Sequence, residues 1–132
     1  MKIKSLDIKI RRPTSRELDT LDKDRAIAQA LPESREILIT DILGRSKDYR
    51  DAVVLHEFGH ILKGKLDSST LRQELAASYF VLTIKPSNEP AKDSIRVLRH
   101  KAMNQGYLLP VLRILENLAM RDAGYTGKPV SN

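Results

Sequence analysis

The stretch VVLHEFGHILKG, residues 53–64, contains two of the three histidines of this 132-residue chain, four positions apart, with a glutamate directly after the first. Ser46 can cap a helix that covers about residues 47–62. Residues four apart lie one above the other on the same face of a helix, so His56 and His60 can direct imidazole nitrogens at one point. The stretch therefore predicts a helix that carries two ligands of a metal ion.

Zinc is the metal that this pair of histidines favours. It binds imidazole nitrogen at about 2.0–2.1 Å in a tetrahedral shell, and catalytic sites use three protein ligands and leave the fourth position to water. Glu57 is turned about a third of the way round the helix from His56, which places its carboxylate beside the open position. Zinc lowers the pKa of its bound water towards about 7, and Glu57 can take the proton and pass it to a leaving amine. We therefore expect one zinc ion per chain, with Glu57 as general base and acid.

A third ligand is needed, and three residues are candidates. Glu74 lies early on the next predicted helix, where an antiparallel helical hairpin would bring its carboxylate back over the two imidazoles. Asp67 is also geometrically possible, although it is one residue away from metzincin-like spacing. His100 lies between Arg99 and Lys101, on the polar side of its helix, which favours a solvated histidine. We expect Glu74 to complete the set.

Gly59 lies inside the helix that carries the two histidines. A glycine in a helix interior costs about 1 kcal/mol relative to alanine, and it usually marks a place where another segment packs closely. Gly59 therefore predicts the close approach of a neighbouring helix, and the helix that supplies the third ligand would be such a neighbour.

The remaining sequence predicts an α+β fold, with a small sheet packed on a helical layer. Residues 1–123 are expected to form one compact domain, and residues 124–132, rich in Gly, Pro and polar residues, a flexible tail that is long enough to fold over a cleft. Alternating aliphatic residues, capping boxes and prolines predict strands at 2–10 and 35–43 and helices at 14–31, 47–62, 70–85, 90–105 and 108–122.

Composition narrows the class of protein. No apolar run approaches the roughly 18 residues of a membrane span, the N-terminus lacks the apolar core of a secretory signal, and there is no cysteine, so a cytoplasmic protein without thiolate metal ligands is expected. The net charge of +6 allows an acidic partner. The basic stripe Lys92, Arg96 and Arg99 is interpreted as a solvated face, because no aromatic residues lie between the charges and no nucleic-acid motif is present.

HEFGH at residues 56–60, with a glutamate in ELAAS at 74–78, resembles the gluzincin metallopeptidases, and the small size is similar to the minigluzincins and the ImmA/IrrE-type peptidases. The resemblance covers about residues 35–85. It implies a zincin-like active-site helix and glutamate helix, His56, His60 and Glu74 as zinc ligands, and Glu57 as general base and acid. The implied activity is that of a zinc metalloendopeptidase, acting on protein or peptide by attack of a zinc-bound water.

In such enzymes the strand before the active-site helix is an edge strand that pairs with extended substrate. The resemblance thus implies that substrate binds to EILIT, that is, to Ile37, Leu38, Ile39 and Thr40. Two positions depart from the thermolysin-like pattern, which has Asn and Asp where this chain has Gln73 and Ser78, so the partner of a zinc-bound histidine is not identified. The oxyanion stabiliser is open among four candidates, Tyr49, Tyr79, Tyr107 and His100.

Two alternatives come from other classes of protein. The first is a regulatory binding module in which zinc is structural, or a protease-like partner of a transcriptional repressor. The second is a basic nucleic-acid-binding protein without metal. Its binding to DNA or RNA would depend on salt and would survive the substitution His56→Ala.

Overall fold

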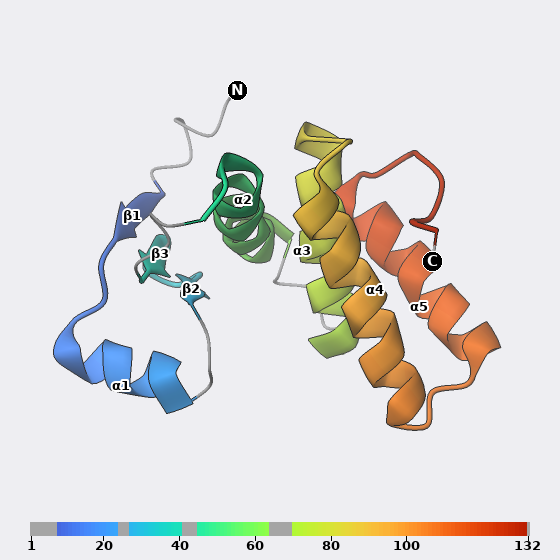
Figure 1. The fold of residues 1–132 in the computed structure, drawn as a ribbon, viewed down its shortest axis with the longest axis horizontal. Helices are drawn as coiled ribbons and strands as arrows, with labels where there is room; N and C mark the ends of the chain where they lie inside the picture. Colours follow the sequence, from blue (N-terminus) through green and yellow to red (C-terminus); the bar gives the residue numbers. More distant parts are fainter. Residues whose placement is uncertain (1–7, 24–26, 41–44, 64–69, 132) are drawn as a thin grey trace.

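The computed structural model describes residues 8–23, 27–40, 45–63 and 70–131. Over these ranges the chain has an α+β fold of five helices and a three-stranded mixed sheet (Figure 1). The elements in chain order are β1 (Lys9–Arg11), α1 (Ser15–Lys23), β2 (Ala28–Leu31), β3 (Glu36–Ile39), α2 (Lys47–Lys63), α3 (Thr70–Ile84), α4 (Glu89–Asn104) and α5 (Leu109–Ala123).

The sheet has the order β1-β3-β2, with β1 parallel and β2 antiparallel to β3. Strand β3 is therefore central, and its Ile37 and Leu38 are fully buried. The expectation that residues 37–40 form a substrate-binding edge is wrong, because the backbone of β3 is paired with a strand on each side and the Thr40 N–H donates to the carbonyl of Ile27. Among the described strands, β2 lies at the edge of the sheet next to α2, and its other edge has no described strand partner.

The predicted helix over residues 14–31 is half right. Its capping box is present, because the Glu17 N–H donates to Thr14 Oγ1 and the Thr14 N–H donates to the Glu17 carboxylate. The helix ends at Lys23, however, and residues 28–31 form strand β2. Pro32, expected to stop a helix, instead begins the turn of the β2–β3 hairpin, because pairing with the apolar strand β3 overrides the strong intrinsic helix preference of AQAL.

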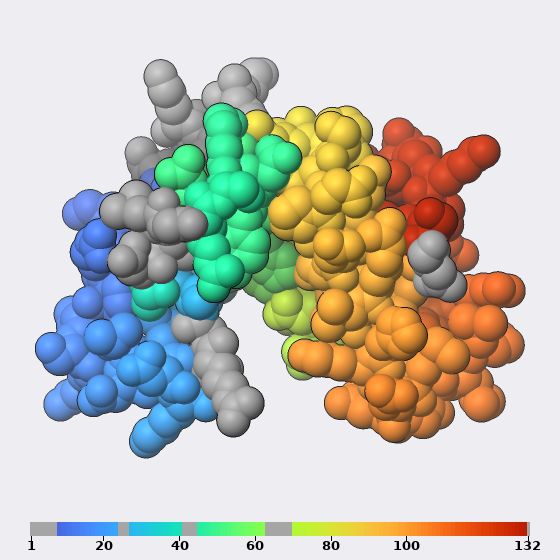
Figure 2. All heavy atoms as spheres, viewed as in Figure 1, coloured from blue at the N-terminus to red at the C-terminus, as the bar shows by residue number. Residues whose placement is uncertain are grey.

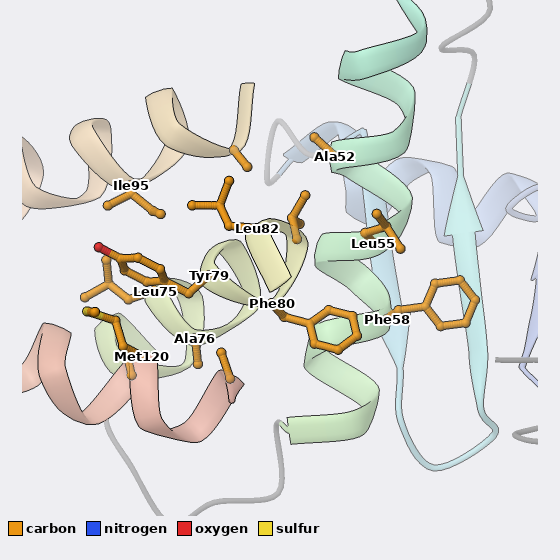
Figure 3. Close-up of a cluster of buried hydrophobic side chains, with 14 of the residues drawn as sticks. Ala52, Leu55, Phe58, Leu75, Ala76, Tyr79, Phe80, Leu82, Ile95 and Met120 are labelled. Carbon is orange, nitrogen blue, oxygen red and sulfur yellow. The ribbon is translucent and has the colours of Figure 1, made fainter. Parts of the chain in front are cut away.

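Helix α2 lies between the sheet and α3, and α3 in turn packs against α4 and α5 (Figure 1). Figure 3 shows that α3 supplies side chains on both of its sides: Phe80 points towards α2, and Tyr79 points between α4 and α5. Helices α2 to α5 begin and end within one or two residues of their predicted bounds. Within the described residues, no helix is long and apolar enough to cross a membrane.

Residues 124–131 are anchored to the helical layer and do not form the predicted loose tail. Val130 is buried, its N–H donates to the hydroxyl of Tyr79, and its carbonyl accepts from the Arg99 guanidinium. The Ser131 carbonyl accepts from Arg96. This segment lies against α4 and α5, and none of its residues lines the cavities around His56 and His60, so it does not cover the predicted metal site.

The basic stripe of α4 is neutralised within the chain. Each of its three cations lies within ion-pair distance of a carboxylate, in the pairs Lys92 with Glu89, Arg96 with Asp93 and Arg99 with Glu116. Arg99 and Arg96 therefore help to hold α4, α5 and the C-terminal segment together. The interpretation of the stripe as a solvated face is wrong for Arg99, whose side chain is only 14% exposed and is bound to the buried Glu116.

Candidate metal centre

Helices α2 and α3 approach each other closely at Gly59. A Cβ atom on Gly59 would lie 3.0 Å from the Cα of Ala77 and 3.2 Å from the Cβ of Phe80, and the first distance involves backbone that cannot move alone. Glu74 lies three residues before Ala77, and therefore one turn away on the same face of α3. The predicted close approach at Gly59 is confirmed, and it brings the Glu74 carboxylate to the two histidines.

His56, His60 and Glu74 converge on one point. The Nε2 atom of His56 lies 2.9 Å from Glu74 Oε2 and 3.1 Å from His60 Nε2, and His60 Nε2 lies 3.1 Å from Glu74 Oε1. Tetrahedral ligation with metal–ligand bonds of about 2.0–2.1 Å separates neighbouring donor atoms by about 3.3 Å. Each of these three contacts is within a few tenths of an ångström of that spacing, with the two Glu74 oxygens facing one histidine each, and one ligand atom from each residue lies within 4.8 Å of the other two. A donor set of two imidazoles and a carboxylate suits zinc.

The other two candidate ligands do not join this group. His100 is exposed on α4 and is not part of the cluster that the described residues form. Asp67 lies outside the described residues. Among the residues that the structure describes, Glu74 is the one that completes the set with the two histidines.

The charges in this cluster depend on one another. Burial opposes ionisation of Glu74, but hydrogen bonds and charge from His56 and His60 outweigh it and hold the pKa of that carboxyl well below its usual range. Burial likewise opposes protonation of His60, but Glu74 outweighs it and raises the pKa of the imidazole. The carboxylate therefore stays ionised and is available to a cation.

Ser78 supplies the partner of His56 that the sequence left unidentified. Its Oγ lies 3.1 Å from His56 Nδ1 and 3.0 Å from the Oγ of Ser94 on α4. When His56 Nε2 binds a metal, Nδ1 keeps its proton and donates to Ser78, whose own proton can then go to Ser94. This relay fixes the ring of His56 through hydroxyls rather than a carboxylate. In the sequence, the signal for this partner was a serine within the otherwise apolar run AASYF, four residues after Glu74 and therefore on the same face of α3.

Glu57 lies between the ligand cluster and strand β2. Its carboxyl accepts a hydrogen bond from the backbone N–H of Ala30, and burial raises its pKa despite the opposing effect of His56 and His60. Alternate residues of a strand direct their N–H and C=O groups to opposite edges, so Ala28 and Ala30 present theirs to the free edge of β2. Glu57 is thus beside both the ligand cluster and an edge that can pair with extended peptide.

Two cavities flank the ligand cluster, and both are bounded by β2. The smaller, of about 440 Å³, is lined by Gln29, Ala30, Pro32, His60 and Gln73 in addition to the residues shared with the larger. The larger, of about 580 Å³, extends from His56 along α4. In Figure 2 the hollow opens between the blue and cyan N-terminal part and the orange helix α4, with green parts of α2 and α3 at its floor.

The lining of the two cavities shows which of the four candidates for the oxyanion stabiliser lies beside the ligand cluster. Tyr49 lines the larger cavity together with His56 and Glu57. Tyr79 is buried on the opposite side of α3, where its hydroxyl donates to Glu116. Neither Tyr107 nor His100 lines either cavity. Of the four, Tyr49 is the one whose side chain borders the site.

No family model, curated protein or solved structure matches the chain. The function is therefore inferred from the geometry of the site itself.

Proposed function

We propose that the chain is a zinc-dependent metallopeptidase of the gluzincin type that hydrolyses an internal peptide bond of a protein or peptide. The observation that carries the proposal is the convergence of His56, His60 and Glu74, whose ligand atoms lie within 4.8 Å of one another, with Glu57 directly beside them. In this proposal α2 is the active-site helix, α3 the glutamate helix and β2 the edge strand of a zincin-like fold.

The proposed roles follow from the positions of the side chains. A zinc ion, when bound, would activate water as a nucleophile and polarise the substrate carbonyl. Glu57 accepts the proton of the attacking water and delivers it to the leaving nitrogen, because it borders both the ligand cluster and the strand edge. Ser78 and Ser94 hold His56 in the orientation that directs Nε2 at the metal.

Substrate is proposed to bind as an extra strand on the free edge of β2. Ala28 and Ala30 have small side chains and line the smaller cavity, so an extended peptide can approach their backbone groups closely, and at the Ala30 N–H it takes the place of the Glu57 carboxyl. A peptide paired there passes directly over Glu57. Tyr49 is proposed to donate its hydroxyl to the oxygen of the carbonyl under attack.

The experiment that tests the proposal compares Glu57→Ala with Glu89→Ala, which removes a carboxylate from an exposed position on α4. Both variants, purified without a histidine tag, should contain about one zinc per chain by elemental analysis. Glu57→Ala should lose peptide hydrolysis by at least about a hundredfold, since general-base catalysis contributes that much or more. Glu89→Ala should remain active. Hydrolysis by Glu57→Ala at the wild-type rate would overturn the proposal.

A further inference from the structure

We infer that the larger cavity is the subsite that selects the substrate, and that Lys101 at its α4 wall favours a substrate residue with a carboxylate side chain. The inference deepens the proposed function, on which it rests for the position of the scissile bond. The supporting observations are the shape of the cavity, the charges that line it, and the difference between the two cavities on either side of the ligand cluster.

The larger cavity is long enough to hold a whole side chain beside the reacting bond. On α4 it extends from Pro90 to Lys101, eleven residues or about 16 Å of helix. Aliphatic side chains line part of it between these ends, with Ile27 from the β2 side and Val53 and Val81 from α2 and α3. Such walls suit the methylene stem of a side chain, and the polar groups at the ends of the cavity then decide which terminus it carries.

Outside the ligand cluster and Glu57, the charged side chain that lines the cavity is Lys101. The cations of the basic stripe on α4 are paired with carboxylates, whereas the described residues offer Lys101 no carboxylate at ion-pair distance. At the other end, the Arg45 guanidinium lies 5.2 Å from the ring centroid of Tyr49, which lines the cavity. With a divalent ion on the ligands, the charges of Glu57 and Glu74 are balanced and Lys101 leaves the cavity with a net positive charge.

The smaller cavity has a different character. Apart from the site residues that both cavities share, its polar side chains are His60 and the two neutral amides Gln29 and Gln73. A peptide on the edge of β2 would place one flank of its scissile bond over each cavity. Selection for an acidic residue is therefore expected on one side of the cleaved bond and not on the other.

The test uses one probe, a terminally blocked decapeptide library randomised at every position, with two readouts. The first is cleavage by the zinc-loaded wild-type chain, with sequencing of the products. The second is retention of library peptides on immobilised, zinc-loaded Glu57→Ala, which does not require turnover. Cleavage is repeated with Lys101→Glu, and retention with Lys101→Glu combined with Glu57→Ala. Arg113→Glu is the control in both readouts. Arg113 is exposed on α5 and lies outside the larger cavity, and its substitution gives the same change in net charge.

Wild-type products should be enriched about threefold in Asp and Glu at one position within two residues of the cleaved bond, the size expected for an exposed ion pair. Lys101→Glu should shift the preference towards Lys and Arg by about tenfold in total, and Arg113→Glu should not. Retained peptides should show the same enrichment, and 1 M NaCl should remove it, because the screening length falls to about 3 Å.

The outcomes separate the inference from the proposed function. Cleavage without an acidic preference, or with a preference that Lys101→Glu leaves unchanged, overturns the inference and leaves the peptidase in place. Acidic enrichment on Glu57→Ala that depends on Lys101, without cleavage by the wild type, supports the subsite and overturns the peptidase. If the wild type cleaves no peptide and Glu57→Ala retains none, both the inference and the proposed function are overturned.

Discussion

Helix α3 carries two clusters of polar and charged side chains on opposite sides, and the consecutive residues Ser78 and Tyr79 belong to different ones. On one side, Glu74 and Ser78 meet the histidines of α2. On the other, the Tyr79 hydroxyl and the Arg99 guanidinium both donate to the buried carboxylate of Glu116. Both clusters combine a carboxylate with cations or potential cations, yet they differ in what surrounds them.

The Glu116 cluster is closed, whereas the Glu74 cluster is open. The side chain of Glu116 is only 7% exposed, and its donors also bind the backbone of Val130, so every group has a partner within the chain. The side chain of Glu74 is 36% exposed, and three potential metal ligands direct their atoms at a common point beside two cavities. The comparison indicates that the first cluster stabilises the fold and that the second is arranged for a ligand.

The largest expected effect on stability comes from opening the closed cluster. Glu116→Ala leaves the partly buried Arg99 and the buried hydroxyl of Tyr79 without their acceptor, which should lower the free energy of unfolding by about 3–5 kcal/mol. Urea denaturation of the zinc-loaded protein measures it. The folded fraction should still bind one zinc per chain. Loss of zinc with unchanged stability would reverse the roles assigned to the two clusters.

Removing the anchored C-terminal segment should have the next largest effect. Deleting residues 124–132 exposes the site of Val130, whose burial contributes about 1.5–3 kcal/mol, and the melting temperature should fall accordingly. Because the segment lies away from the cavities, the rate of peptide hydrolysis per folded molecule should not rise. Activation of hydrolysis by the deletion would instead support an inhibitory tail.

The serine relay offers a graded test of the open cluster. Ser78→Ala removes the acceptor of the His56 Nδ1 proton and should weaken zinc binding by about 10–100-fold, as for other partners of metal-bound histidines. Ser94→Ala removes only the second link and should have a smaller effect in the same direction. Competition with a chelator measures both affinities. Equal zinc affinity in the wild type and Ser78→Ala would contradict the relay.

The smallest expected effect concerns the contact between the two helices. Gly59→Ala gains about 1 kcal/mol of helix propensity but places a Cβ against the backbone of Ala77, and such overpacking costs about 1–3 kcal/mol. A net destabilisation of about 1 kcal/mol is expected in thermal unfolding. Zinc affinity should fall as well, because α3 carries Glu74. A variant more stable than the wild type would show that the helices are free to separate at this point.

Local signals in the sequence were sufficient for helices α2 to α5 and for the residues of the His56, His60 and Glu74 cluster. The capping residue Ser46 predicted the start of α2, Gly59 predicted a close contact with a neighbouring helix, and the position of Glu74 on the next helix predicted that its carboxylate would lie beside the two histidines. These features depend on residues a few positions apart, or on two consecutive helices. This is why one sequence could specify them.

Features that depend on distant pairing were missed. AQAL has no strand signal of its own and becomes β2 only by pairing with β3. Because β2 was not predicted, β3 was taken for the edge strand, although the edge beside Glu57 belongs to β2. The contact of Ser78 with Ser94 joins two helices, and the burial of Val130 depends on three. None of these is encoded in local periodicity.

The most direct test of the proposed metal site is to titrate zinc into the metal-free wild-type chain and into metal-free Glu74→Ala, and to measure both affinities by calorimetry. The account predicts one zinc per wild-type chain and an affinity at least about a hundredfold lower for Glu74→Ala, since loss of a ligand should exceed loss of a ligand's partner. A wild-type chain that does not bind zinc, or a Glu74→Ala variant that binds it equally well, would contradict the account.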